Sequence, residues 1–182
     1  MIEAEIKRII EKYPEMWTKQ LYKVGYNLIN VNDAMSRNFF VESGILKCFD
    51  INDDTLEEII IAFFTNGDII FPYRGHEIIP SNVNFQVIED AVLNSISADN
   101  WNIICETEPV TDALLKNQIP VWIMNKMISY IKCNSYPTSA ERYKKMITEF
   151  PFLLRVKDED LSKHLGIDRR TIVRIKTKLL LE

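Results

Sequence analysis

The chain has little histidine, cysteine and glycine. Of its 182 residues, two are histidine, three are cysteine and five are glycine. Cys48, Cys105 and Cys133 are far apart and form no Cys-x-x-Cys pair, which disfavours a disulfide framework, a zinc site and a cysteine-ligated iron–sulfur cluster. We therefore expect them to be buried or half-buried free thiols. His76 and His164 are isolated, so a metalloenzyme site built from clustered histidine and carboxylate ligands is not expected.

Long apolar runs are also missing. The longest candidate, Ile59 to Phe64, has the length of a strand, far short of the roughly 18 residues that a membrane span needs. Residues 1–5 lack the basic start and apolar stretch of a secretory signal. The sequence shows no nucleophile–base pair and no phosphate-binding glycine loop. These absences predict a soluble, cytoplasmic protein that is not an enzyme.

The net charge of −4 argues against nucleic-acid binding when it is taken alone, but it hides an asymmetry. Residues 136–182 contain 11 Lys and Arg against 7 Asp and Glu, a net charge of +4. Residues 1–135 contain 11 basic and 19 acidic residues, a net charge of −8. This division suggests two functions, one of which faces a polyanion, although a two-domain protein can be lopsided by chance.

The first part of the chain reads as one helix followed by strands. Apolar residues at helical spacing predict a helix over 3–13. Residues 21–85 have short runs rich in Val, Ile, Phe and Tyr between turn residues, so we expect strands there. We predict a hairpin over 39–49 that turns at Ser43-Gly44, and a pair of strands over 85–96 around Glu89-Asp90. Several short strands with polar turns indicate an antiparallel sandwich or barrel.

Helical patterns return at residue 98, with Asp99 or Asn100 as the expected N-cap. A long helix is predicted after Pro120, with a broad apolar stripe formed by Val121, Met124, Met127, Ile128 and Ile131 and widened by Trp122, Ile123 and Tyr130. The stripe can pack on the chain's own barrel or on the same helix of a second subunit. Thr138 or Ser139 can cap a further helix that runs from Arg142 to Phe150, and we place a domain boundary at 134–137.

Two short helical patterns meet at Gly166 near the C-terminus. Leu161 and Leu165 share one face of the first pattern, and Gly166 can adopt the positive φ that ends a helix. Ile167 can fill the angle between the helices, and Asp168 can cap the second helix. Ile172, Ile175 and Leu179 form the expected buried face of that second helix.

The opposite face of the second helix is basic, with Arg169, Arg170 and Arg174 followed by Lys176 and Lys178. The major groove admits one helix whose N-terminal side chains reach base edges, and arginine can bridge O6 and N7 of guanine. The lysines are expected to meet phosphates, and His164 in the first of the two helices is expected beside solvent or phosphate. A basic amphipathic helix alone is usually a solvated face, but the full pattern of spacing, glycine, cap and basic face favours DNA recognition.

The segment from Leu161 to Ile175 resembles the Crp/Fnr family of transcription regulators, and the order of elements resembles that family over nearly the whole chain. The sharpest match is 168–175, which is similar to the family's recognition-helix pattern of the type Ser-Arg-Glu-Thr-Val-Gly-Arg-Ile. Gly44-Ile45-Leu46-Lys47 and 66–70 are similar to glycine signatures of the family's barrel, and 141–151 is similar to the first helix of its DNA-binding domain.

The resemblance implies an α+β fold: an antiparallel, jelly-roll β-barrel like cyclic-nucleotide-binding domains, a long dimerisation helix and a helical (winged) helix-turn-helix domain. The expected bounds are 1–118 for the sensor domain, 119–135 for the dimerisation helix and hinge, and 136–182 for the DNA-binding domain. The implied partners are double-stranded DNA with a palindromic operator, a second copy of the chain and RNA polymerase.

The resemblance also assigns roles to residues. The expected DNA-binding residues are Arg169, Arg170, Thr171, Arg174, Lys176 and Lys178. Arg169 and Arg174 fall on the family's base-contacting arginines, and Thr171 falls on a position that tends to touch the DNA backbone. Arg170 stands where the family often has a glutamate that accepts from cytosine; because arginine cannot accept a hydrogen bond, the operator should differ at that base pair. The family often carries a wing hairpin after the recognition helix, but only Leu179-Leu180-Leu181-Glu182 follow here, so either the wing is absent or the sequence is cut short.

The sensor part departs from members that bind cyclic nucleotides. Those members use a Gly-Glu pair for the ribose and an Arg followed by Ser or Thr for the phosphate. The matching stretch here, 74–85, has Arg74 before the glycine, and no Lys or Arg follows Gly75 before Lys116. A buried phosphate without a cation is costly, so we expect no cAMP or cGMP. No cofactor is predicted, and an effector would be an unidentified small molecule.

Two other functions remain as rivals. The first is a ligand-binding signalling module whose helical tail contacts a protein; a partner-binding helix would more often offer apolar anchors than arginines. The second is an enzyme on a cupin-like barrel, which needs clustered metal ligands that the sequence does not offer.

Overall fold

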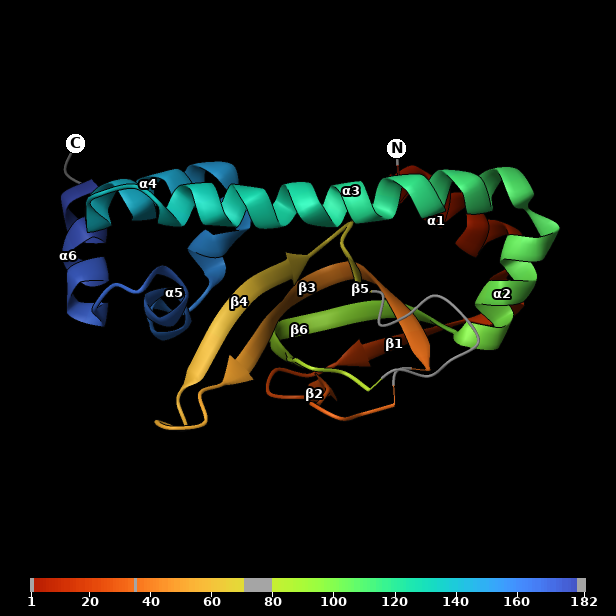
Figure 1. Ribbon diagram of the computed structural model, residues 1–182, viewed down its shortest axis with the longest axis horizontal. Helices are drawn as coiled ribbons and strands as arrows, with labels where there is room; N and C mark the ends of the chain where they lie inside the picture. Colours follow the sequence, from red (N-terminus) through yellow and green to blue (C-terminus); the bar gives the residue numbers. More distant parts are fainter. Residues whose placement is uncertain (1, 35, 71–79, 180–182) are drawn as a thin grey trace. The chain divides into compact units, whose positions relative to one another are not determined.

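The computed structural model describes residues 2–34, 36–70 and 80–179 (Figure 1). The chain divides into two compact units. The first comprises residues 1–48 and 63–122, and the second comprises 49–62 and 123–182. Strand β3 and helix α3 each contribute residues to both units. Among the described residues, no helix is long and apolar enough to cross a membrane.

The elements follow one another in the order helix, strands, helices. The sheet-bearing part contains α1 (Ile2–Lys12), the 3₁₀ turn η1 (Pro14–Met16), β1 (Trp17–Tyr22), β2 (Asn27–Ile29), β3 (Arg37–Ile51), β4 (Glu58–Thr65), β5 (Ile69–Ile70), β6 (Asn84–Ser97), α2 (Ala98–Thr107) and α3 (Pro109–Asn134). It is followed by α4 (Ser139–Glu149), the 3₁₀ turn η2 (Pro151–Arg155), α5 (Asp158–Leu165) and α6 (Arg169–Leu179). The helix predicted over 3–13 is therefore confirmed as α1.

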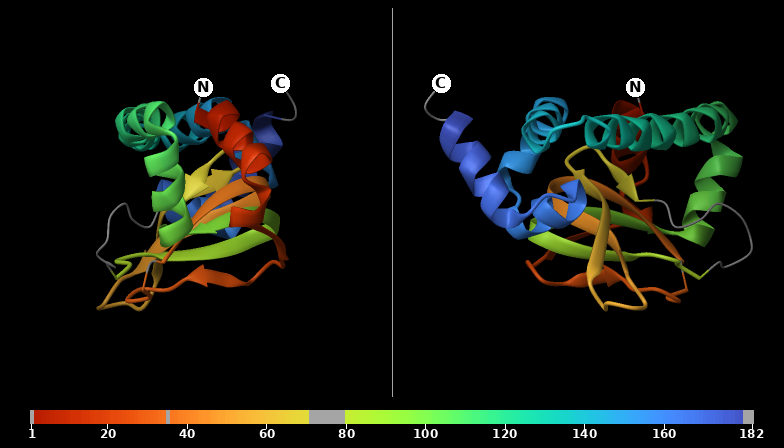
Figure 2. Two further views of the ribbon diagram at one scale, coloured as in Figure 1. Left: turned by 90° about the vertical axis from the view of Figure 1, so that its right-hand side faces the viewer. Right: turned by 60° about the vertical axis from the view of Figure 1, so that its left-hand side comes forward.

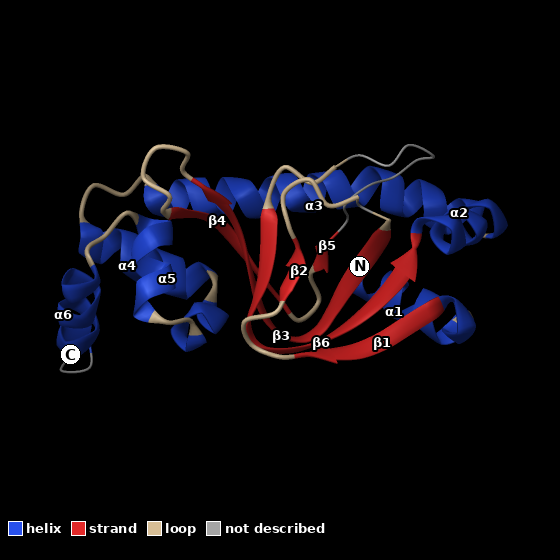
Figure 3. Cartoon of the chain, turned by 90° about the horizontal axis from the view of Figure 1, so that it is seen from below, coloured by secondary structure: helices blue, strands red, loops and turns tan. Residues whose placement is uncertain are grey.

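The strands form one sheet in the order β1-β6-β3-β4, with β2 paired to β6 and β5 paired to β3 (Figure 3). The pairing of β1 with β6 is antiparallel, from Trp17 opposite Ile96 to Tyr22 opposite Ala91. The expected α+β architecture with an antiparallel sheet is confirmed. Within the described residues, however, β1 and β4 are the ends of the strand order, so the sheet is open where a closed barrel was expected.

The predicted hairpin over 39–49 is wrong, because β3 runs unbroken through Ser43-Gly44. Gly44 does have a positive φ of 90°, but it serves a close approach between strands. A Cβ at Gly44 would lie 2.5 Å from Cα of Ala91 on β6, a distance that real Cβ atoms do not reach. Glycine is therefore required at position 44, because the backbone has a positive φ there and β3 passes close to β6.

The pair of strands predicted over 85–96 is also wrong, because β6 is a single strand of 14 residues. Asp90 lies on that strand and accepts hydrogen bonds from the Val24 backbone N–H at 2.9 Å and from Lys23 Nζ at 2.8 Å. The polar residue Asp90 therefore does not mark a turn; it lies within β6 and binds the segment at Lys23 and Val24.

The hairpin that does form joins β3 to β4. Asn52 N–H donates to the Glu57 carbonyl at 2.9 Å, and the Asn52 side-chain oxygen accepts from the backbone N–H of Asp54 at 2.9 Å. This side-chain bond forms an asparagine turn, for which a run such as Asn52-Asp53-Asp54 is typical. We call residues 49–62, which belong to the second unit, the β3–β4 hairpin.

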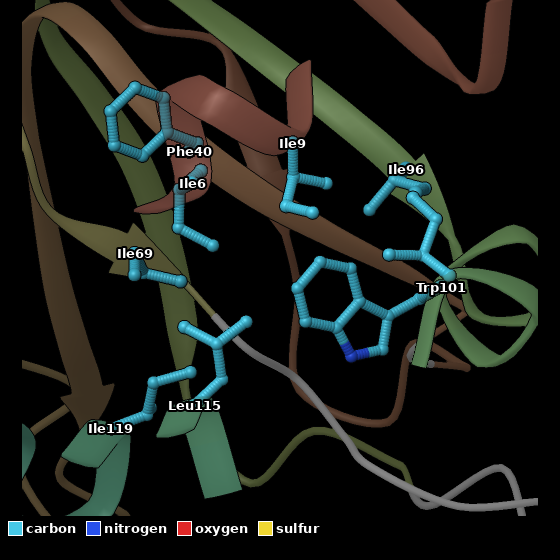
Figure 4. Packing of buried hydrophobic residues seen from close by; sticks show 9 residues of the cluster. Ile6, Ile9, Phe40, Ile69, Ile96, Trp101, Leu115 and Ile119 are labelled. Carbon is cyan, nitrogen blue, oxygen red and sulfur yellow. The ribbon is translucent and has the colours of Figure 1, made fainter. Parts of the chain in front are cut away.

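The core of the first unit lies between the sheet and helices α1, α2 and α3 (Figure 4). Its members come from every one of these elements: Ile6, Ile9, Phe40, Ile69, Ile96, Trp101, Ile104, Leu115 and Ile119. Ser97 caps α2 by accepting from the backbone N–H of Asn100 at 3.2 Å, so the expected caps Asp99 and Asn100 lie inside the helix.

Helix α3 begins at Pro109, although its start was predicted after Pro120, and it contains Pro120 in its interior. A proline removes only one donor from the helix, which the flanking turns of a 26-residue helix can tolerate. The Thr138 cap is confirmed: its hydroxyl accepts from Glu141 N–H, and the Glu141 carboxylate accepts from Thr138 N–H, a complete capping box. All three cysteines are free, with Cys48 and Cys133 buried and Cys105 half-buried, as expected.

Candidate nucleic-acid interface

Helices α5 and α6 meet at a turn that the sequence predicted in detail. Gly166 ends α5 in the left-handed conformation, with φ 59°, and Ile167 is buried. Asp168 Oδ1 accepts from the backbone N–H of Arg170 at 2.8 Å and of Thr171 at 3.4 Å, so it caps α6. These local contacts fix the direction in which α6 leaves the turn.

One face of α6 is buried in the second unit. Ile172 and Ile175 are buried, and they lie at helical spacing. Helix α6 packs against α5 and against α4, whose buried residues are Tyr143 and Met146 (Figure 2). Because this face is anchored by apolar contacts, the opposite face of α6 is held outward.

The outward face carries the arginines that the sequence singled out. Arg169, Arg170 and Arg174 are exposed, and Lys178 is exposed one turn beyond Arg174. Within residues 2–34, 36–70 and 80–179, none of the three guanidinium groups forms an ion pair with a carboxylate. The structure therefore brings the three arginines and Lys178 together on one side of a short helix, with their charges available to a ligand.

Two of the sequence-predicted residues lie apart from this face. Lys176 is near the buried side of α6, and its ammonium pairs with the carboxylate of Asp158 on α5. Thr171 is half-buried at the other border of the face. In contrast, Val173 and Thr177 lie on the outward face and are exposed, although the sequence analysis did not include them. Their i, i+4 spacing from Arg169 is the signal that would have found them.

His164 is the clearest correction in this region. It was expected beside solvent or phosphate, but its side chain is buried, with the residue only 7% exposed. Nδ1 lies 3.0 Å from the backbone carbonyl of Ile60, and the ring meets Tyr130 edge-on with 5.0 Å between centroids. Its spacing of three from Leu161 places it on the buried face of α5. Burial lowers the pKa of His164, and its hydrogen bond to the Ile60 carbonyl opposes that shift.

The partner of His164 belongs to the β3–β4 hairpin, which contacts α5 at a second point. Lys163 Nζ lies 3.1 Å from Glu58 Oε2 on β4 and 3.7 Å from Glu159 on its own helix. The contacts of Lys163 with Glu58 and of His164 with Ile60 each join residues more than a hundred positions apart in the sequence. The hairpin therefore braces the first helix of the pair, and no local sequence signal could have indicated this contact.

In the sensor part, the structure describes fewer of the residues on which the predictions depend. Arg74, Gly75 and His76, on which the cyclic-nucleotide prediction partly depends, lie outside the described residues. A cavity of about 290 Å³ in the first unit is lined by Leu28, Ile29, Asp33, Ala34, Ser36, Arg37 and Phe39. The Arg37 guanidinium donates to Ser95 Oγ at 2.9 Å. Among the described residues, no group of three or more His, Cys, Asp or Glu side chains could hold a metal ion.

No protein-family model and no curated protein sequence matches the chain. Solved structures do match it. FixK2 from Bradyrhizobium japonicum is 16% identical, with a TM-score of 0.73 over 91% of this chain and 85% of that protein. CLP from Xanthomonas campestris, described as a c-di-GMP-responsive global regulator, is 16% identical, with a TM-score of 0.68 over 98% and 91%. A regulator from Eubacterium rectale, assigned to the Crp/Fnr family, is 18% identical, with a TM-score of 0.67 over 98% and 83%.

At 16–18% identity, these matches concern the fold. They cover both compact units of the chain and most of each matched structure. The fold of this chain thus occurs in solved structures, two of which are described as regulators. This chain has the fold of the Crp/Fnr-type transcription regulators.

Proposed function

We propose that the chain is a dimeric, sequence-specific DNA-binding transcription regulator of the Crp/Fnr type, in which α5, the Gly166 turn and α6 form a helix-turn-helix. The observation that carries the proposal is the two-sided character of α6. Its isoleucines are buried, while Arg169, Arg170 and Arg174 are exposed and form no ion pair within the described chain.

A recognition helix needs this arrangement. Each arginine can donate two hydrogen bonds to O6 and N7 of a guanine, which discriminates against a wrong base by about 1–3 kcal/mol. Lys178 at the far end of the face is suited to a phosphate, and Thr171 at its border is suited to the DNA backbone. Lys176 is expected to hold α6 against α5 and not to contact DNA, because its ammonium pairs with the carboxylate of Asp158.

The proposed dimer contact is the apolar stripe of α3. Met124, Ile128 and Ile131 share one face of the helix and are 53%, 38% and 65% exposed. Apolar side chains at this spacing are typical of a seam between two helices. A second copy of α3 would cover them and would give two recognition helices related by a two-fold axis, which calls for an inverted-repeat operator.

The proposed sensor binds neither cAMP nor cGMP, because residues 75–115 contain no Lys or Arg to neutralise a cyclic phosphate. An effector would be a small molecule of another class. RNA polymerase as a further partner rests on the family resemblance alone.

The proposal is tested by DNA-binding measurements on alanine variants of α6. Arg169→Ala and Arg174→Ala should each weaken binding to a selected operator about 5- to 150-fold per half-site and relax the choice of base at one position of each half-site. Lys19→Ala, which removes a positive charge from β1 in the first unit, is the control and should bind as the wild type does.

The rival protein-binding function makes a different prediction. If the tail bound a protein, DNA retention would be weak and both arginine variants would behave as the control does. A regulator instead loses DNA affinity steeply as salt rises, because each phosphate contact releases counterions.

A further inference from the structure

The middle of the outward face of α6 is apolar, although its surroundings are cationic. Val173 lies one helical turn after Arg169 and Arg170 and directly before Arg174. It is 47% exposed, whereas its neighbour Ile172 is fully buried. The Thr177 hydroxyl, one turn later on the same face, donates to the Val173 carbonyl at 3.0 Å, so its proton is used within the helix.

An isolated exposed valine is ordinary on a protein surface. Val173 differs because of its position: the side chains around it on the outward face are the arginines proposed to reach base edges. A side chain in that position meets the floor of the groove when the arginines do. Valine offers only methyl groups, and in a helix it holds one strongly preferred rotamer, so it presents those methyl groups rigidly.

The major groove presents one apolar group, the C5-methyl of a pyrimidine. Thymine carries it in every A·T pair, and apolar side chains contact it. A methylated cytosine carries the same group at the same ring position. The remaining base edges in the groove are hydrogen-bond donors and acceptors, which valine cannot satisfy.

We propose that Val173 is a specificity-determining residue that recognises a pyrimidine C5-methyl group beside the base pairs bound by the arginines. This inference rests on the proposed function and deepens it. It assigns a thymine to each operator half-site at a position adjacent to a guanine contact. Burying one methyl group on the complex corresponds to about a fourfold gain in affinity.

The test uses the full-length protein and synthetic duplexes of the operator selected from a random library. Each half-site thymine is replaced in turn by deoxyuridine, which lacks the methyl group and keeps the base pairing. Wild-type protein should lose about fourfold in affinity at one position of each half-site and little at the others. Val173→Ala should bind the thymine and deoxyuridine duplexes equally at that position.

The controls separate the methyl group from other effects. Val110→Ala changes an exposed valine at the start of α3 and should retain the wild-type preference for thymine. Duplexes with cytosine or 5-methylcytosine at the same position, each opposite guanine, identify the source of the methyl group. If the methyl group alone is read, 5-methylcytosine binds more tightly than cytosine, and Val173→Ala removes the difference. Equal binding of the two cytosines restricts the contact to thymine.

The inference would be overturned by any of three results: deoxyuridine leaves the affinity unchanged at every position, the selected half-site contains no thymine, or Val173→Ala keeps the full preference for thymine. These results differ from failure of the proposed function, in which no sequence is enriched and the arginine variants bind as the Lys19→Ala control does.

Discussion

Lys176 and Lys178 differ in what their ammonium groups contact. They lie two residues apart on α6, and both were expected to meet phosphates. The structure pairs Lys176 with Asp158 on α5, where both side chains are less than a third exposed, whereas Lys178 is exposed on the outward face. Lys176 therefore joins two helices, and Lys178 is the one that the proposed function places at DNA.

This difference predicts opposite results for two alanine variants. Lys176→Ala should lower the free energy of unfolding by about 0.5–1 kcal/mol and leave the salt dependence of DNA binding unchanged. Lys178→Ala should leave stability unchanged and reduce the slope of log affinity against log salt by about one unit. Urea unfolding and DNA titrations at several salt concentrations measure the two quantities. The assignment is wrong if Lys176→Ala reduces the salt slope as much as Lys178→Ala does.

Gly44 and Gly25 allow the cost of a close approach to be measured apart from the cost of a positive φ. Their φ angles are 90° and 89°, but a Cβ at Gly44 would meet β6 while a Cβ at Gly25 would meet no atom within 4 Å. Gly25→Ala should cost about 1–2 kcal/mol of stability from backbone strain. Gly44→Ala should cost about 1–3 kcal/mol more, because β3 and β6 must separate. Thermal unfolding compares them, and equal losses would contradict the close approach.

At the scale of elements, the β3–β4 hairpin contacts α5, the first of the proposed DNA-reading helices, through His164. The buried imidazole can only donate a hydrogen bond to the Ile60 carbonyl, because a carbonyl oxygen offers no proton. Neutral His164 with its proton on Nδ1 therefore fits the site, and burial of the ring disfavours a second proton.

A pH dependence of stability follows. Because burial lowers the pKa of His164 in the folded chain, the unfolded chain binds a proton more readily as the pH falls below the ordinary value of 6.5. Stability should therefore decrease from pH 7 to pH 5. His164→Asn keeps a donor for the Ile60 carbonyl without a titratable ring, so it should flatten this decrease, although losing the contact with Tyr130 lowers stability throughout.

Val110→Ala, at an exposed position without a titratable group, is the control and should retain the wild-type slope. The carboxylate of Glu108 does not titrate in this window, because its pKa is lowered to about 2 mainly by its hydrogen bond from Lys12. Urea unfolding between pH 5 and pH 7 gives the comparison. An unchanged slope in His164→Asn would show that His164 does not titrate as described.

Elements whose signals are local could be predicted from the sequence. The turn at Gly166, the Asp168 cap and the buried isoleucines of α6 depend on residues within a few positions of one another, and the structure confirms them. The errors arose where a local signal had a distant cause. Gly44 looked like a turn because glycine marks both turns and close approaches, and only the pairing with β6 distinguishes them. Likewise, the contact of His164 with Ile60 joins segments that no sequence pattern relates.

At the scale of the whole molecule, the proposed function requires two copies. The exposed stripe of α3 gives an apolar surface that a second copy would cover, and substitution by glutamate would place a charge in that contact. Ile131→Glu should therefore convert a dimer to a monomer and weaken operator binding at least tenfold, because one recognition helix per molecule remains. Light scattering after size exclusion measures the mass.

Ile103→Glu is the matched control, since Ile103 is 47% exposed on α2, outside the stripe. This variant should remain dimeric. If Ile131→Glu also remains dimeric, the two copies use another surface.

The most direct test of the account is selection of DNA from a random library by the wild-type protein. If α6 is a recognition helix presented twice by a symmetric dimer, the enriched sequences should form an inverted repeat whose half-site centres are about 34 Å apart, one turn of the duplex. Failure to enrich any sequence at low salt would contradict the claim that the arginines of α6 read DNA.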